Sequence, residues 1–172
     1  MLFRSLELER LGATIEPLPD LSTSDQTVLD GWVAARLPLS ALVFDAAGAF
    51  GSGGEAGLQT GLQHAWSAAR ALATGALIPG SDAGRVLFVA PRPDSGPLAA
   101  AARAALENLA RTLSVEWARF TVTAVAIWPG AATTDEQLAA LLGFLLSDAG
   151  AYFSGCRFEL GAAAEPAFIP AS

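Results

Sequence analysis

The chain has 172 residues, of which 52% are apolar and 16% charged, and its formal net charge is −7 at pH 7. One domain is expected at this length. The negative charge disfavours nucleic acid as a partner, because such partners require a concentrated basic face. The apolar runs fall far short of the roughly 20 residues that span a bilayer. We therefore expect a soluble, cytoplasmic protein with no membrane partner.

Several residue types that carry chemistry are scarce in this chain. All ten basic residues are arginines, so lysine is missing, and the only histidine, tyrosine and cysteine are His64, Tyr152 and Cys156. Chemistry based on lysine or tyrosine is therefore almost excluded. One cysteine cannot form an internal disulfide, and no cluster of metal ligands surrounds it, so no metal site is predicted. His64, on a predicted helix beside Trp66, is interpreted as a packing residue.

The first half of the chain alternates short β-type runs with helical stretches. Thr23 and Gln26 have the spacing of a capping box, in which each side chain bonds the other residue's main chain. The pattern predicts a short strand over residues 13–21, a helix from the capping box to about residue 36, a buried strand over 41–46, a glycine-rich loop over 48–57 and a helix over 58–77.

The second half continues the same alternation, and Thr134 with Gln137 makes a second capping box. It predicts strands over 85–90, 121–128 and 157–160, and helices over 98–119 and 134–146. Alternating strands and helices are typical of an α/β fold with a parallel sheet. We predict a single domain over 1–172 with about five mostly parallel strands and with loose arms at 1–12 and 162–172.

Four segments resemble, in their order, the short-chain dehydrogenase/reductase (SDR) family. They are "LVFDAAG" (42–48), "GRVLFVAPR" (84–92), "AVAIWPGAATT" (124–134) and "LLGFLLSDAGAYFSGCRFELG" (141–161). The resemblance extends from about residue 11 to 161 and omits the family's first portion. It implies a Rossmann-like three-layer sandwich with a reduced sheet, in which strand 41–45 lies at an edge and pairs with a neighbour or with the N-terminal segment.

The family's catalytic positions hold other residues here. The family reaction uses a tyrosine, a lysine four residues later and a serine. When "RAAL" (103–106) is laid on the family pattern, Ala99 takes the tyrosine position and Arg103 the lysine position, and Pro91 stands where the serine strand ends. A methyl group cannot transfer a proton. The resemblance therefore implies a pseudoenzyme, a noncatalytic subunit of an oxidoreductase complex.

The cofactor site is also incomplete in this comparison. The family holds the dinucleotide pyrophosphate on a glycine-rich turn after the first strand, and the resemblance begins after that unit. The stretch 48–57 lacks the spacing of a nucleotide loop. We expect no cofactor, with only vestiges of cofactor-side positions at Asp20, Asp45, Pro129, Gly130 and Thr134.

What the resemblance preserves is the pair of long helices through which family members assemble. Apolar positions at helical spacing predict interface residues at Leu62, Trp66, Ala105, Leu109, Leu113 and Trp117. The leading hypothesis is a noncatalytic subunit that pairs with itself or with an active full-length SDR homologue.

A second hypothesis keeps a small-molecule function. It is an SDR-like oxidoreductase or binding protein with a rebuilt pocket around Arg92, Asp94 and Arg103. Against this pocket, the spacing of Arg103 and Glu107 predicts an ordinary surface ion pair one helical turn apart.

Overall fold

A four-stranded parallel sheet forms the centre of the computed structural model, which describes residues 8–10, 12–22, 25–46, 50, 54–80 and 82–161. The strands lie in the order β1-β2-β3-β4. Their bounds are Ala41–Asp45 for β1, Gly84–Val89 for β2, Val122–Pro129 for β3 and Arg157–Leu160 for β4. The parallel α/β prediction is confirmed, and among the described strands β1 lies at an edge, as expected.

The predicted strand over residues 13–21 is wrong, so the sheet has four described strands and not about five. Pro17 and Pro19 lie within that run, and proline has no main-chain N–H to give to a ladder. Ala13 and Ile15 instead pack by their side chains against the core.

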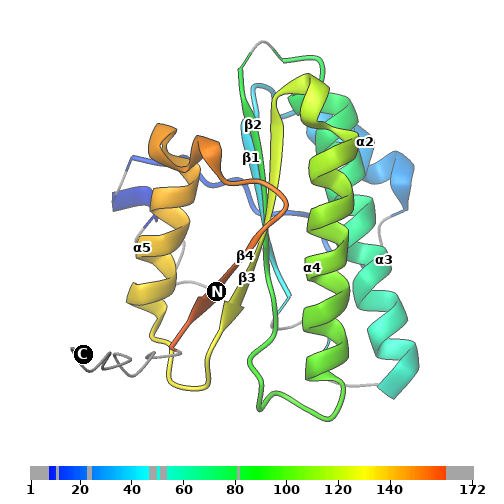
Figure 1. Cartoon of the computed structure of the whole chain (residues 1–172). Coiled ribbons are helices and arrows are strands. Elements are labelled where there is room, and N and C mark those ends of the chain that lie inside the picture. The colour runs from blue at the N-terminus through cyan, green and yellow to red at the C-terminus, as the bar shows by residue number, and fades with distance from the viewer. Residues whose placement is uncertain are drawn as a thin grey trace, which may run out of the picture.

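Helices cover both faces of the sheet (Figure 1). The α3 and α4 helices lie on one face, where α2 packs beside α3, and α5 lies on the other. The bounds are Gln26–Ala34 for α2, Gly54–Leu72 for α3, Ala99–Glu116 for α4 and Asp135–Leu146 for α5. A π-helical turn, Ala73–Leu77, extends α3, and 3₁₀ turns at Ala118–Phe120 and Asp148–Tyr152 follow α4 and α5.

The side chains of β2 divide between two cores. Val86 and Phe88 join the core beneath α3 and α4, and Leu87 and Val89 join the core beneath α5. This alternation follows from the two-residue period of a strand, and burial on both sides explains the apolar run from Val86 to Val89 within β2. Leu8 is only 4% exposed in the second core, although it falls in the stretch 1–12 where a loose arm is predicted.

The starts of α5 and α2 follow from their capping residues. Thr134 and Gln137 form the predicted capping box of α5, with both reciprocal bonds present. At α2 the cap is Asp25, whose carboxylate accepts from the main-chain N–H of Val28 at 3.0 Å. The predicted box began at Thr23, which lies outside the described residues. The capping bond of Asp25 places the start of α2 at Gln26.

Candidate functional site

The family-like catalytic positions meet at the carboxyl ends of β2 and β3, the edge where open α/β sheets bind ligands. Pro91 follows β2, Pro129 ends β3, and the buried Ala99 begins α4. Arg103, one turn into α4, donates from one guanidinium nitrogen to the carbonyl oxygens of Pro91 at 2.9 Å and of Pro129 at 2.8 Å. Arg103 therefore links the two strand ends, and we call this arrangement the Arg103 clamp.

A second arginine makes a similar clamp on the neighbouring loop. Arg92 donates to the carbonyl oxygens of Gly130 at 2.8 Å, Ala131 at 3.1 Å and Thr133 at 2.6 Å. Asp94, the third residue of the hypothetical rebuilt pocket, is exposed. Both guanidinium groups are thus bonded to main-chain carbonyls. This leaves the hypothetical pocket fewer N–H donors with which to bind a ligand.

The Arg103 guanidinium also lies over the ring of Trp128, 4.7 Å from its centre. Arg157 lies over the same ring at 4.3 Å, so the indole contacts two cations. Burial lowers the pKa of Arg103 from its ordinary value, with Arg157 acting in the same direction and Glu159 against it. An arginine stays protonated at physiological pH even so, and it offers no group for proton transfer.

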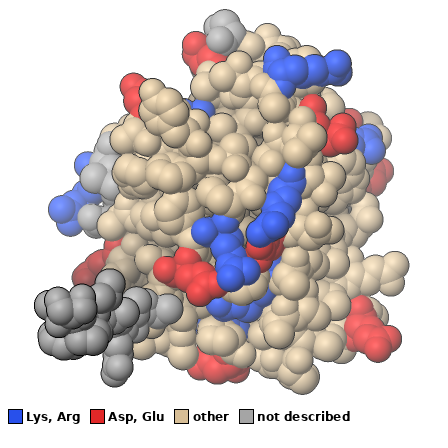
Figure 2. Space-filling model, in the orientation of Figure 1, with Lys and Arg blue, Asp and Glu red and all other residues tan. Residues whose placement is uncertain are grey.

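The predicted pair between Arg103 and Glu107 is wrong. Glu107 binds Arg111 at 2.6 Å and Arg157 at 2.9 Å, and Arg157 also binds Glu159 at 2.8 Å. Figure 2 shows positively and negatively charged side chains next to one another near the middle of the face that it displays. The Glu107–Arg111 spacing is a helical i,i+4 signal that sequence reasoning could have found. The bonds to Arg157, 50 residues away, have no such signal.

The positions on the turn after β3 that were predicted as cofactor-side vestiges form hydrogen bonds within that turn and to β4. The Gly130 N–H donates to the Thr133 hydroxyl at 2.8 Å, and that hydroxyl donates to the carbonyl oxygen of Leu160. A Cβ atom at Gly130 would lie 2.6 Å from the same carbonyl oxygen, so the close approach of β4 requires glycine. Thr134 caps α5.

Two further positions predicted as cofactor-side vestiges, Asp20 and Asp45, lie in the N-terminal part of the chain. Asp20 accepts bonds from the main-chain N–H of Ser22 at 2.9 Å and from its hydroxyl at 2.7 Å. These bonds hold the pKa of Asp20 below its ordinary range. Asp45 is the last residue of β1.

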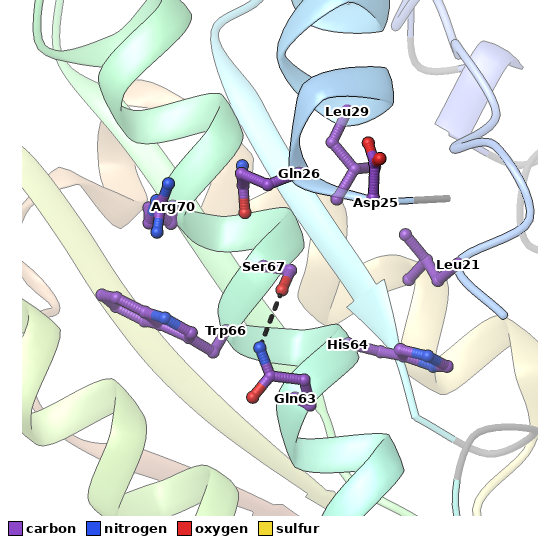
Figure 3. Close-up of a pocket in the computed structure, with 9 residues that line it drawn as sticks. All are labelled: Leu21, Asp25, Gln26, Leu29, Gln63, His64, Trp66, Ser67 and Arg70. Atoms are coloured by element: carbon purple, nitrogen blue, oxygen red, sulfur yellow. Dashed lines mark hydrogen bonds between the residues drawn. The ribbon is translucent and has the colours of Figure 1, made fainter. Parts of the chain in front are cut away.

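A half-open groove of about 350 Å³ lies between α2 and α3 (Figure 3), and sequence reasoning did not find it. Several of its polar groups are already bonded within their own helices. Gln63 donates to Ser67 at 3.2 Å, and Gln26 donates to Asp30 at 2.7 Å. The groove is lined by Leu21, Asp25, Gln26, Leu29, Gln63, His64, Trp66, Ser67 and Arg70.

No group of three or more metal-ligating side chains occurs among the residues that the structure describes. Cys156 is half-buried, and burial raises the pKa of its thiol, which disfavours the reactive thiolate. Tyr152, on the 3₁₀ turn after α5, is 92% exposed. Within the described ranges, no helix combines the length and the apolar character needed to cross a membrane.

Solved structures share this arrangement of elements. A short chain dehydrogenase from Mycobacterium smegmatis has 21% identity and a TM-score of 0.67, over 84% of this chain and 68% of that one. A short chain dehydrogenase/reductase family oxidoreductase from Burkholderia thailandensis has 20% identity and 0.67, over 88% and 74%. A citronellol catabolism dehydrogenase from Pseudomonas aeruginosa has 22% identity and 0.67, over 91% and 76%.

The chain has a short-chain dehydrogenase fold. The recognised resemblance and the reduced Rossmann-like sheet are thus confirmed at the level of fold. No protein-family model and no curated protein sequence matches the chain.

The charge network makes stability depend on pH in a defined direction. The pKa of Glu107 is held below its ordinary value, chiefly by the hydrogen bond from Arg157 and also by the positive charges of Arg157 and Arg111, although burial acts in the opposite direction. The ordinary pKa of a free glutamate is about 4.3. A lowered folded-state pKa stabilises the fold above the unfolded-state pKa, and this contribution is lost as pH falls through the folded-state pKa.

Glu107→Gln is therefore expected to lower the free energy of unfolding at pH 7, and the difference from the unchanged chain should shrink as pH falls below the ordinary glutamate pKa of about 4.3. Urea unfolding between pH 3 and 7 measures it, with Glu116→Gln, at an exposed position on the same helix, as the control. A difference that persists undiminished at pH 3 would contradict the assignment.

Proposed function

We propose that the chain is a noncatalytic SDR-like subunit of an oxidoreductase complex, which assembles with itself or with an active full-length SDR homologue and supports its structure. The observation that carries the proposal is the use of Arg103. The residue at the family's lysine position bonds the Pro91 and Pro129 carbonyls and so links the strand ends.

The remaining chemistry of this edge supports the same proposal. Ala99 has no proton to transfer, and Pro91 has no hydroxyl to hold a substrate oxygen. The one tyrosine and the one histidine are on the turn after α5 and on α3. Among the described residues, neither the tyrosine nor the histidine forms a hydrogen bond with Arg103 or with the two carbonyls that Arg103 binds.

The proposed contact surface uses α3 and α4, which lie side by side on one face of the sheet (Figure 1). Trp66 is 38% exposed, and Leu62, Ala105 and Leu109 are half-buried, so these four can contact another subunit. Leu113 and Trp117, also predicted as interface residues, belong to the core of this chain. They support the helix from beneath, and the proposed contact omits them.

The purified chain is expected to bind neither NAD nor NADP, since the lysine that would contact the nicotinamide ribose is missing and Arg103 is already bonded. Isothermal titration calorimetry with each dinucleotide should give no binding heat up to millimolar concentration. An active SDR of the same host is the positive control. Micromolar affinity for either dinucleotide would contradict the noncatalytic proposal.

Assembly is tested by co-expressing the tagged chain with the nearest encoded active SDR. Size-exclusion chromatography with light scattering then gives the mass of the purified material, and the SDR's thermal stability is compared with and without the chain. Supporting results are a stable oligomer of the chain alone or a defined complex with the SDR. A monomer that leaves the SDR's mass and stability unchanged would overturn the proposal.

A further inference from the structure

The groove between α2 and α3 holds hydrogen-bond donors that the fold does not use (Figure 3). Among the described arginines, Arg70 is the one whose guanidinium makes no hydrogen bond, ion pair or ring contact. Ser67 accepts from Gln63 at 3.2 Å, but its own O–H has no acceptor in the described chain, and neither has the indole N–H of Trp66. These three donors lie on adjacent turns of α3.

Apolar side chains lie beside these donors. Leu29 of α2 is 1% exposed, Leu21 is half-buried, and Trp66 keeps 38% of its surface exposed. The groove encloses about 350 Å³, which is at the small end of the roughly 300–1,000 Å³ of ligand cavities. Apolar walls with a few well-placed polar groups are the usual composition of a small-molecule site.

The charge of the groove differs between its two ends. In Figure 3, Arg70 and Trp66 lie toward one end of the groove. Asp25, His64 and Leu21 lie toward the other end. One oxygen of the Asp25 carboxylate caps α2, and the group keeps its negative charge. An anionic ligand group is therefore attracted to the Arg70 end and repelled from the Asp25 end.

We propose that this groove binds a small carboxylic acid with an apolar body, in its carboxylate form. The planar guanidinium of Arg70 binds the two carboxylate oxygens side by side, and the Ser67 hydroxyl supplies a further donor. The apolar body lies against Trp66 and Leu29. A carboxylate is favoured over a phosphate because a single unpaired cation balances one negative charge, whereas a phosphate monoester carries about −1.5 to −2 at pH 7.

This site is separate from the proposed assembly. Of the residues that line the groove, Trp66 is the one that also belongs to the proposed α3–α4 contact. Binding is therefore measured on the purified chain without an SDR partner, and again on the Ala105→Arg chain, in which the α3–α4 contact should be broken. A groove that binds no carboxylate leaves the assembly proposal intact, and a monomeric chain leaves the groove proposal intact.

Titration with 3-phenylpropionate, followed in ¹H–¹⁵N correlation spectra, tests the binding. The chain has four tryptophans, and the indole N–H signal of Trp66, identified by its loss in Trp66→Phe, should shift and saturate. The signal of Trp128, whose indole N–H is buried, should stay in place. For a ligand of about eleven non-hydrogen atoms, the expected dissociation constant is about a millimolar or lower.

Two comparisons test the role of the carboxylate. 3-Phenylpropionamide has the same apolar body without the charge and should bind at least about tenfold more weakly. Arg70→Gln should weaken the binding of 3-phenylpropionate at least about tenfold. Arg119→Gln, at an exposed arginine outside the groove, should leave it unchanged. Circular dichroism shows that the variants keep their helices, as expected for Arg70, which has no partner to lose.

A further variant fills the groove and leaves Arg70 in place. Ser67→Leu puts a larger side chain between the two helices and should abolish the saturable shift. Equal affinities for the acid and the amide, or unchanged binding by Arg70→Gln or by folded Ser67→Leu, overturns the inference. So does a Trp66 signal that does not move at tens of millimolar 3-phenylpropionate, both in the unchanged chain and in Ala105→Arg.

Discussion

Replacing Ala105 with arginine is expected to dissociate the assembly that we propose forms through α3 and α4. Ala105 is half-buried on α4, and the small side chains around it, Ala101, Ala102 and Ala104, allow another helix to approach closely. An arginine there would bring an unpaired charge into a packed seam, at a cost of about 3–5 kcal/mol. Each 1.4 kcal/mol is tenfold in affinity, so the dissociation constant should rise by roughly a hundredfold or more. Leu109→Arg, one turn along, should act in the same direction.

Sedimentation equilibrium measures this change, with circular dichroism to show that the helices persist. Ala34→Arg is the matched control, since it makes the same substitution at an exposed alanine on α2. If Ala105→Arg and Ala34→Arg keep the same association constant as the unchanged chain, α4 does not provide the contact.

Arg103→Ala is expected to destabilise the fold by about 2–4 kcal/mol. It would leave the Pro91 and Pro129 carbonyls without their charged donor, and hydrogen bonds to charged groups contribute about 1.5–3 kcal/mol. It would also remove a cation from the Trp128 ring, a contact worth about 0.5–1 kcal/mol or more. Arg103→Lys should recover only part of the loss, because an ammonium group lacks the planar guanidinium that stacks on the ring.

Denaturant unfolding of these variants measures the free energies. Arg70→Ala, at an exposed position on α3, should change stability by no more than about 0.5 kcal/mol. An Arg103→Ala chain as stable as Arg70→Ala would show that the clamp contributes nothing. Arg103 would then again be a candidate ligand group of the rebuilt pocket, and the noncatalytic proposal would lose its main support.

Together, Ala105→Arg and Arg103→Ala test the two parts of the proposed function separately. The assembly variant changes a surface and should leave the clamp intact. The clamp variant changes the strand ends and should leave the α3–α4 surface in place as long as the chain is folded. A chain that tolerates both would favour a monomeric function, and the groove between α2 and α3 would then be a candidate ligand cavity.

The local elements of this fold could be predicted from the sequence because their signals are local. Continuous apolar runs bounded by turn residues gave β1, β2 and β3 to within a residue or two. The reciprocal side chains of Thr134 and Gln137 gave the start of α5. The order of these elements was also enough to identify the fold class, since alternating strands and helices close into a parallel sheet.

The errors arose where a local pattern competed with packing. The pattern of residues 13–21 predicted a strand, but the prolines in this run cannot donate main-chain hydrogen bonds to a neighbouring strand. Its apolar side chains pack instead against the core beneath α5. Leu8 was assigned to a loose arm because nothing nearby in sequence shows what covers it. Its burial depends on the apolar face of a sheet whose strands come from distant segments.

By itself, the sequence determined which chemical groups this protein contains: no lysine, one tyrosine, and alanine, proline and arginine at the family-like catalytic positions. Only the tertiary structure decided how those groups are used. The sequence allowed two roles for Arg103, an ion pair with Glu107 one helical turn away or the binding of a ligand. In the structure it donates instead to two carbonyls that lie 12 and 26 residues away. Glu107 forms an ion pair with Arg157, which lies 50 residues further along the chain. The physical reason is that hydrogen-bond partners are selected by distance in space, and the parallel sheet brings strand ends together irrespective of their separation along the chain.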